Sequence, residues 1–112
     1  APEPAMQVQI NTANNIDGRE ALAQSIESDV RHRLSRFEAR LTRVEVHVGD
    51  ENGQRTEGDD KRCVMEARPA GLGPVTVSEQ AGSIDQATAG ALDKLATALD
   101  RTFGKLTNRK GH

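Results

Sequence analysis

The sequence predicts an α+β fold: a four-stranded, mostly antiparallel sheet with two helices packed on one face, in the order β-α-β-β-β-α. Four short segments alternate apolar and polar residues, so each predicted strand has one buried and one solvated face. Two longer segments repeat apolar residues every three or four positions, the spacing of an amphipathic helix. The 112 residues suffice for one packed core, so we expect residues 6–112 to form a single domain.

The N-terminal part predicts a tail, a strand and a helix. Residues 1–5 are rich in proline, and we expect a disordered tail or an appended remnant. Residues 7–12 alternate strictly, which predicts the first strand. Asp17 followed by Glu20 is a capping-box pattern, and it predicts a helix over about residues 18–40. The apolar stripe of this helix comprises Leu22, Ile26, Val30, Leu34, Phe37 and Leu41.

The middle of the chain predicts three strands. Residues 43–48 and 61–68 alternate apolar and polar positions, and a polar, acidic segment at 49–60 separates them. Residues 69–74 contain the prolines and glycines of a turn, and a fourth strand starts at residues 75–78. The last two strands are therefore expected to form a hairpin.

The C-terminal part predicts the second helix, over about residues 84–106. Ser83 is the expected N-cap, with Gln86 at the capping-box position. Phe37 and Phe103 are the chain's two aromatic residues, and both lie in apolar stripes, so we expect them in the core. The second stripe comprises Ile84, Ala91, Leu92, Leu95, Leu99, Phe103 and Leu106.

The sequence offers no constellation for catalysis. It lacks a Gly-x-Ser-x-Gly elbow, a phosphate-binding glycine loop and a His-Glu-x-x-His pattern. Cys63 and His47 lie on adjacent predicted strands, but the alternation points Cys63 inward and His47 outward. Glu57, Asp59 and Asp60 lack the ligand spacing of an EF-hand. We therefore expect no metal, no cofactor, no small-molecule substrate and no enzymatic activity.

The composition favours a cytoplasmic protein. No apolar run approaches the roughly 18–20 residues that a membrane span needs, so we expect no membrane partner. The first residues show neither the basic region nor the apolar stretch of a signal peptide. The single cysteine excludes a disulfide within the chain, as is typical of a reducing compartment.

Charge is segregated along the chain, although the net charge is only −2. Residues 31–43 and 94–112 each carry a net charge of +4, and the rest of the chain carries −10. Two basic segments on an acidic body are typical of a protein that binds a polyanion.

Helical geometry concentrates these basic residues. On a continuous helix the arginines of residues 33–43 would lie within an arc of about 80°, and three basic residues of the second helix within about 40°. A guanidinium group donates two hydrogen bonds to one phosphate. Because no aromatic residues interleave with the charges, we expect contacts to the backbone and shape of folded RNA. The candidate RNA contacts are Arg33, Arg36, Arg40, Arg43, Lys94, Arg101, Lys105 and Arg109.

With these residues in place, the chain resembles the family of ribosome hibernation-promoting factors and ribosome-associated inhibitor A. The resemblance covers nearly all of residues 6–110. In the second helix the family typically reads Ile/Leu-Asp-x-Leu-x-x-Lys-Leu-x-x-Gln-Leu, followed by lysines. The matching segments here are Glu20-Ala21-Leu22, Arg33-Leu34, Arg40-Leu41, Val44-Glu45-Val46, Ala91-Leu92-Asp93-Lys94-Leu95, Leu99, Arg101 and Lys105-Leu106.

The resemblance implies a translation regulator that binds the small ribosomal subunit in the channel between its head and body. There it would occupy the path of messenger RNA and the anticodon ends of transfer RNA, stabilise idle ribosomes under starvation or cold, and block translation. The long members carry a C-terminal dimerising domain, and we expect this chain to correspond to the short form and to act as a monomer. Carried over position by position, the ribosomal RNA contacts fall on Arg33, Arg40, Lys94, Arg101 and Lys105.

The second helix departs from the family pattern in its charge. Thr97 and Phe103 stand where basic residues are common, and Asp100 adds a negative charge. Because each lost phosphate contact lowers affinity and its salt dependence, weaker RNA binding is expected.

Three other functions compete with this hypothesis. A double-stranded-RNA-binding module shares the α-β-β-β-α order, but residues 7–12 add a strand, and Ser83-Ile84-Asp85 is acidic where that module needs a phosphate clamp. A protein-interaction or stress-response domain without an RNA partner is the second, and the older description of the family as sigma-factor modulators belongs here. Only polyanion binding weakens steeply with salt, which separates it from the first hypothesis. An enzyme is the third.

Overall fold

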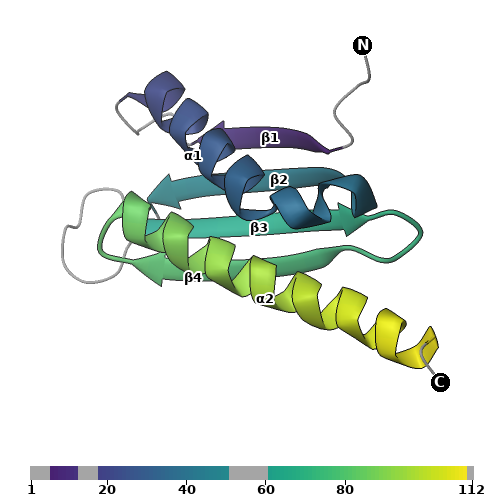
Figure 1. Cartoon of the computed structure of the whole chain (residues 1–112). Helices are drawn as coiled ribbons and strands as arrows, with labels where there is room; N and C mark the ends of the chain where they lie inside the picture. The colour runs from purple at the N-terminus through teal and green to yellow at the C-terminus, as the bar shows by residue number, and fades with distance from the viewer. Residues whose placement is uncertain (1–5, 13–17, 51–60, 111–112) are drawn as a thin grey trace, which may run out of the picture.

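The computed structural model confirms the predicted element order (Figure 1). It describes residues 6–12, 18–50 and 61–110, and of Arg19, Asp50 and residues 105–110 it describes the backbone alone. The expected tail at residues 1–5 and the acidic residues Glu57, Asp59 and Asp60 lie outside the described residues. The elements are β1 (Gln7–Thr12), α1 (Arg19–Arg33), the 3₁₀ helix η1 (Ser35–Arg40), β2 (Leu41–Asp50), β3 (Lys61–Pro69), β4 (Val75–Ala81) and α2 (Ile84–Lys110).

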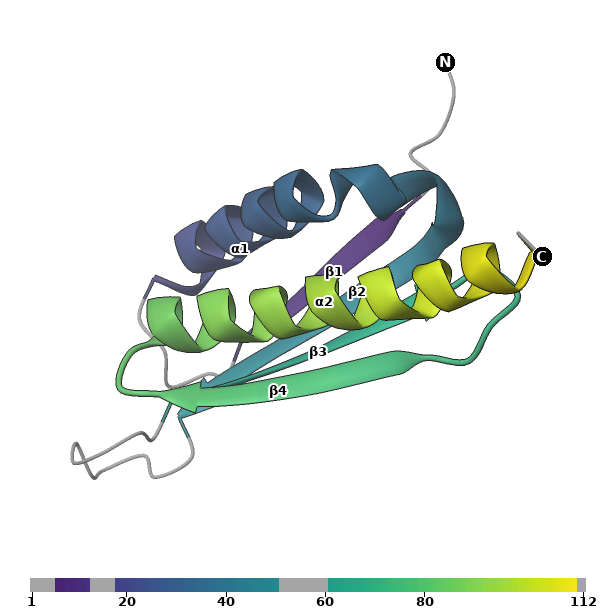
Figure 2. The ribbon, with the colours of Figure 1, turned by 60° about the horizontal axis from the view of Figure 1, so that its bottom comes forward.

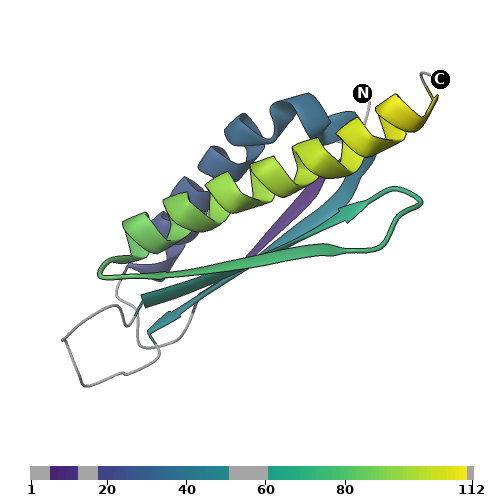
Figure 3. The ribbon, with the colours of Figure 1, turned by 90° about the horizontal axis from the view of Figure 1, so that it is seen from below.

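The four strands form one sheet in the order β1-β2-β3-β4. β1 runs parallel to β2, with Val8 opposite Val44. The β2–β3 and β3–β4 pairs are antiparallel, and β3 and β4 form the predicted hairpin. Both helices cover the same face of this sheet, as Figures 2 and 3 show. The predicted α+β class is therefore confirmed.

The core lies between the sheet and the two helices. The predicted inward faces of β2 and β3 are buried there, and the Cys63 side chain is among them. The inward apolar residues of the edge strands β1 and β4 are partly buried against this core. Phe37 and Phe103 are buried as predicted, and their ring centroids lie 5.5 Å apart. Because the other core side chains are aliphatic or sulfur-containing, this ring pair is the aromatic contact between η1 and α2.

The first helix is shorter than predicted. α1 ends at Arg33, and η1 follows after Leu34, where the N–H of Phe37 donates to the Leu34 carbonyl at 2.9 Å. Leu41, the last residue of the predicted stripe, instead begins β2 opposite Pro69. The stripe continues through this break because the Leu34–Phe37 spacing of three positions also suits a 3₁₀ turn. No glycine or proline between residues 34 and 41 marks the change in the sequence.

The two helix starts compare differently with their predictions. α2 begins as predicted, since the N–H of Gln86 donates to Ser83 Oγ at 3.1 Å. The N-cap of α1 is Gly18, in a left-handed conformation with φ 68° and no side-chain hydrogen bond. Glycine adopts that conformation without a Cβ penalty. Asp17 itself lies outside the described residues.

Candidate nucleic-acid interface

The basic residues of the first segment are distributed over three elements. Arg33 is the last residue of α1, Arg36 and Arg40 belong to η1, and Arg43 lies on β2. The 80° arc expected on one continuous helix is therefore wrong. Three of these arginines remain together, because η1 continues along the helix layer, and all three are exposed to solvent.

Arg43 lies on the opposite face of the molecule. Its neighbour Val44 is fully buried under the helices, so strand alternation directs Arg43 to the solvated face of the sheet. There Arg43 pairs with Glu45 at 2.9 Å and donates a hydrogen bond to Gln9. The structure thus separates Arg43 from the other predicted contacts.

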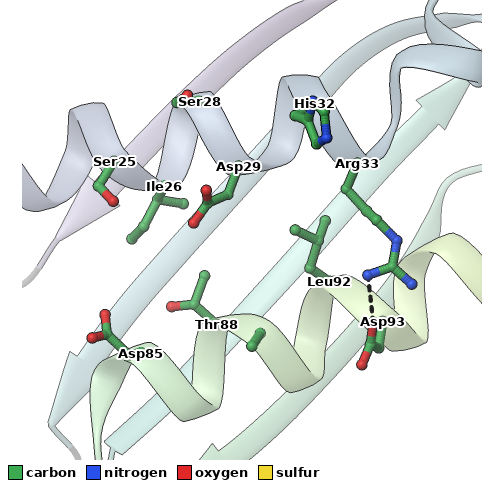
Figure 4. A pocket seen from close by; sticks show the side chains of 11 residues that line it. Ser25, Ile26, Ser28, Asp29, His32, Arg33, Asp85, Thr88, Leu92 and Asp93 are labelled. Carbon is green, nitrogen blue, oxygen red and sulfur yellow. Dashed lines mark ion pairs between the residues drawn. The ribbon is translucent and has the colours of Figure 1, made fainter.

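Two ion pairs connect the arginines of α1 and η1 to α2. Arg33 Nη1 lies 2.5 Å from Asp93 Oδ1, a pair drawn in Figure 4, and Arg36 Nη2 lies 2.7 Å from Asp100 Oδ2. All four side chains are about half exposed. Each pair reduces the positive potential that the charge count alone predicts for this surface.

Arg40 is held differently. Its guanidinium carbon lies 4.0 Å from the centroid of the Phe103 ring, and Arg36 lies 4.5 Å over the ring of Phe37 in the same way. A guanidinium group stacked on a ring keeps its N–H edges available for a ligand. Within the described part of the chain, no carboxylate pairs with Arg40. Arg40 is therefore both oriented and open to an anion.

The described basic side chains of α2 are those of Lys94 and Arg101, which are seven positions apart and therefore lie on the same flank of the helix. Lys94 Nζ lies 2.6 Å from Glu79 Oε1 and donates to the Ser78 carbonyl at 2.9 Å, so its charge is tied to β4. Arg101 is exposed, and among the described residues it makes no ion pair. It borders a shallow hollow together with Lys94 and Thr97. Lys105 and Arg109 lie on α2, and their side chains are outside the described residues.

We call the exposed side chains of Arg33, Arg36, Arg40, Lys94 and Arg101 the helix-layer cations. They are mounted on rigid helical elements that share one face of the sheet (Figure 2). Five cations on this layer can contact several phosphates of a folded RNA at once. The sequence found these residues, but it gave no sign that Asp93 would pair with Arg33 or that Phe103 would support Arg40.

A groove of about 740 Å³ runs between the C-terminal half of α1 and the N-terminal part of α2 (Figure 4). Asp29, Asp85 and Asp93 line it, together with His32 and Arg33. Its excess of carboxylates disfavours a phosphate at this end of the helix layer. Among the described residues, no group of three or more His, Cys, Asp or Glu side chains is placed to hold a metal ion.

Cys63 and His47 point to opposite faces of the sheet, as predicted. Cys63 is fully buried, whereas the His47 side chain is 53% exposed. Burial raises the pKa of the Cys63 thiol from 9.0 to about 11. A buried thiol with a raised pKa is a poor nucleophile.

None of the helices in the described residues has the length and hydrophobicity to cross a bilayer.

Comparisons with known proteins agree with this fold. A sequence profile of the family described as sigma 54 modulation protein / S30EA ribosomal protein matches residues 9–107. The N-terminal domain of Protein Y from Thermus thermophilus is 21% identical, with a TM-score of 0.68 over 87% of this chain and 99% of that chain. A ribosomal subunit interface protein from Coxiella burnetii is 12% identical, with a TM-score of 0.64 over 88% of this chain and 97% of that chain. At these identities the two structures establish the fold. No significant match was found among curated proteins.

Proposed function

The chain belongs to the family of sigma 54 modulation proteins and S30EA ribosomal proteins, which includes the hibernation-promoting factors, and we propose that it is a ribosome-associated regulator of translation. The family is described as modulation proteins and ribosomal proteins, so the chain is not an enzyme. One relative is named for the interface between ribosomal subunits. We place this chain with ribosomes in the cytoplasm.

More specifically, we propose that one copy of the protein binds ribosomal RNA in the decoding channel of the small subunit. The observation that carries it is the group of helix-layer cations, all exposed on the layer that α1, η1 and α2 form. Arginine forks and a lysine on rigid helices suit the phosphates of a folded RNA. A domain bound there would exclude messenger RNA and initiator tRNA by volume alone, with no bond made or broken. The idle ribosome would be stabilised by the same contacts.

Co-sedimentation with purified small subunits, large subunits and whole ribosomes across a salt series tests this proposal. We expect saturation at one copy per small subunit, and an affinity that falls steeply as salt rises. Binding to large subunits alone, or binding that does not respond to salt, would contradict it. The absence of binding to any particle at low salt would favour a protein partner instead.

A matched pair of arginine variants tests which face binds. Arg40→Gln and Arg43→Gln remove the same charge, from the helix layer and from the solvated sheet face respectively. We expect Arg40→Gln to lower the affinity and to reduce the salt slope by about one, and Arg43→Gln to change both much less. The reverse order would mean that the sheet face binds the subunit. For the position of the site, the wild-type protein should also compete with messenger RNA and initiator tRNA for the small subunit.

A further inference from the structure

The helix-layer cations are not equivalent, because three of them, two arginines and Lys94, already hold a carboxylate of the same chain. Arg33 is bound to Asp93 and Arg36 to Asp100, whereas Arg40 and Arg101 meet no carboxylate among the described residues. A carboxylate and a phosphate compete for the same pair of N–H donors on a guanidinium group. An RNA phosphate can therefore take the guanidinium nitrogen that the aspartate occupies on Arg33 or Arg36 only after the aspartate has left.

We propose that Asp93 and Asp100 are internal competitors for RNA phosphates, which occupy Arg33 and Arg36 in the free protein and limit the affinity of the surface. This inference rests on the proposed function and deepens it. Because a polyanion must displace the two aspartates, they raise the charge density that a ligand needs in order to bind.

The exposure of these pairs makes the exchange feasible. The side chains of Arg33 and Asp93 are 48% and 64% exposed, and those of Arg36 and Asp100 are 58% and 52% exposed. Ion pairs so open to water contribute little to stability, so the fold does not depend on keeping them closed. A bound RNA offers a dense phosphate backbone and releases counterions on binding, which a single carboxylate cannot match.

The distance between the two aspartates also indicates the spacing of the phosphates that a ligand must offer. Asp93 and Asp100 are seven residues apart on α2, which places them on the same side of the helix and about 10 Å apart along its axis. The surface therefore holds two anion positions about 10 Å apart, both at the junction with α1 and η1. A folded RNA can supply two phosphates at that spacing together, whereas a single phosphate group displaces one aspartate at most.

Arg36 is held in place by a second contact, so a phosphate can replace Asp100 without the arginine side chain changing its position. Arg36 also lies 4.5 Å over the ring of Phe37, so its guanidinium group has a support other than Asp100. When Asp100 is displaced, Arg36 keeps that support and stays directed at the same position. The phosphate thus finds a guanidinium group that is already placed.

Neutralising the aspartates tests this proposal in the full chain. We expect Asp100→Asn to tighten binding to small subunits by about two- to fivefold, the range of one exposed ion pair. Asp93→Asn should do the same, and the double variant should bind more tightly than either. Asp29→Asn is the matched control, because it makes the same charge change on α1 at an exposed residue that has no ion pair in the described part of the chain.

The decisive measurement is Asp100→Asn in an Arg36→Gln background. If Asp100 acts by occupying Arg36, the gain disappears there. A gain that persists in the Arg36→Gln background, or that Asp29→Asn reproduces in full, would overturn the proposal and leave general charge as the cause. Failure of the wild-type protein to bind small subunits at any salt would overturn the proposed function, and this inference with it. Circular dichroism and urea unfolding of each variant confirm that the fold is unchanged.

Discussion

The guanidinium carbon of Arg40 lies 4.0 Å from the centroid of the Phe103 ring, so an exposed cation of η1 rests on a buried ring of α2. Phe103 itself packs against Phe37, at 5.5 Å between the ring centroids. From the family resemblance we expect a basic residue at the position of Phe103. Phe103 contributes no charge itself, but its ring supports the guanidinium group of Arg40.

Replacing Phe103 by leucine tests whether the ring supports Arg40, because it should lower both the stability of the protein and its binding to the subunit. The change removes the ring face and leaves a small cavity, so we expect the free energy of unfolding to fall by about 1–3 kcal/mol. It should also weaken subunit binding, because Arg40 loses the surface that orients it. Urea unfolding and co-sedimentation measure the two effects.

A double-mutant cycle separates support from packing. Arg40→Ala should lower the unfolding free energy by about 0.5–1 kcal/mol more in the wild-type background than in the Phe103→Leu background. If Arg40→Ala weakens binding equally in both backgrounds, Phe103 does not position Arg40 for its ligand.

Lys94 and Arg101 should behave differently, although both are basic residues on the same flank of α2. Lys94 is held by Glu79 and by the Ser78 carbonyl, so Lys94→Gln should cost about 0.5–1 kcal/mol of stability. Arg101→Gln should cost less than about 0.5 kcal/mol, because Arg101 has no ion pair among the described residues. Neutral variants are preferable here, since a glutamate at position 94 would face Glu79.

The same two variants should differ in the salt dependence of subunit binding. Arg101→Gln should reduce the salt slope by about one, and Lys94→Gln by less, because Glu79 already neutralises Lys94. An equal reduction for both would show that Lys94 leaves Glu79 when RNA binds.

Gly90 lies against the Glu79 side chain. A Cβ atom at Gly90 would lie 2.7 Å from Glu79 Cγ, closer than two carbon atoms can pack. In a Glu79→Ala background, Gly90→Ala should stabilise the protein by up to about 1 kcal/mol, the usual gain of alanine over glycine in a helix. With Glu79 present, that gain should be cancelled or reversed. Thermal or urea unfolding of the four proteins of this cycle checks the expected change of sign.

Burial of Cys63 predicts a loss of stability at high pH. The folded-state pKa is about 11 and the ordinary value is 9.0, so the unfolded chain loses its thiol proton first as pH rises. The contribution is complete below pH 9 and is lost between pH 9 and 11, by up to about 1.4 kcal/mol per pH unit. Cys63→Ala should remove this part of the pH dependence, as measured by urea unfolding at pH 8 and pH 10. Its subunit binding at pH 7.5 should equal that of the wild-type protein.

The order of the elements and the faces of the strands could be read from the sequence, because both depend on local periodicity. Alternation placed Cys63 inside and His47 outside, and the stripe of α2 placed Phe103 in the core. The N-cap at Ser83 was predictable for the same reason, since a capping hydrogen bond joins residues three positions apart. The end of α1 was not predictable, because the residues that follow Arg33 suit either helix type and the pairing of Leu41 with Pro69 decides where β2 starts.

For the candidate site too, local sequence patterns predicted some features and only the tertiary structure decided the others. The sequence by itself determined that cations gather in two segments, each next to an apolar stripe. The tertiary structure alone decided that Asp93 and Asp100 occupy Arg33 and Arg36, and that Arg40 rests on Phe103. Those relationships join residues far apart in the chain. Their geometry is fixed by how α1, η1 and α2 pack on the sheet, and no local pattern records it.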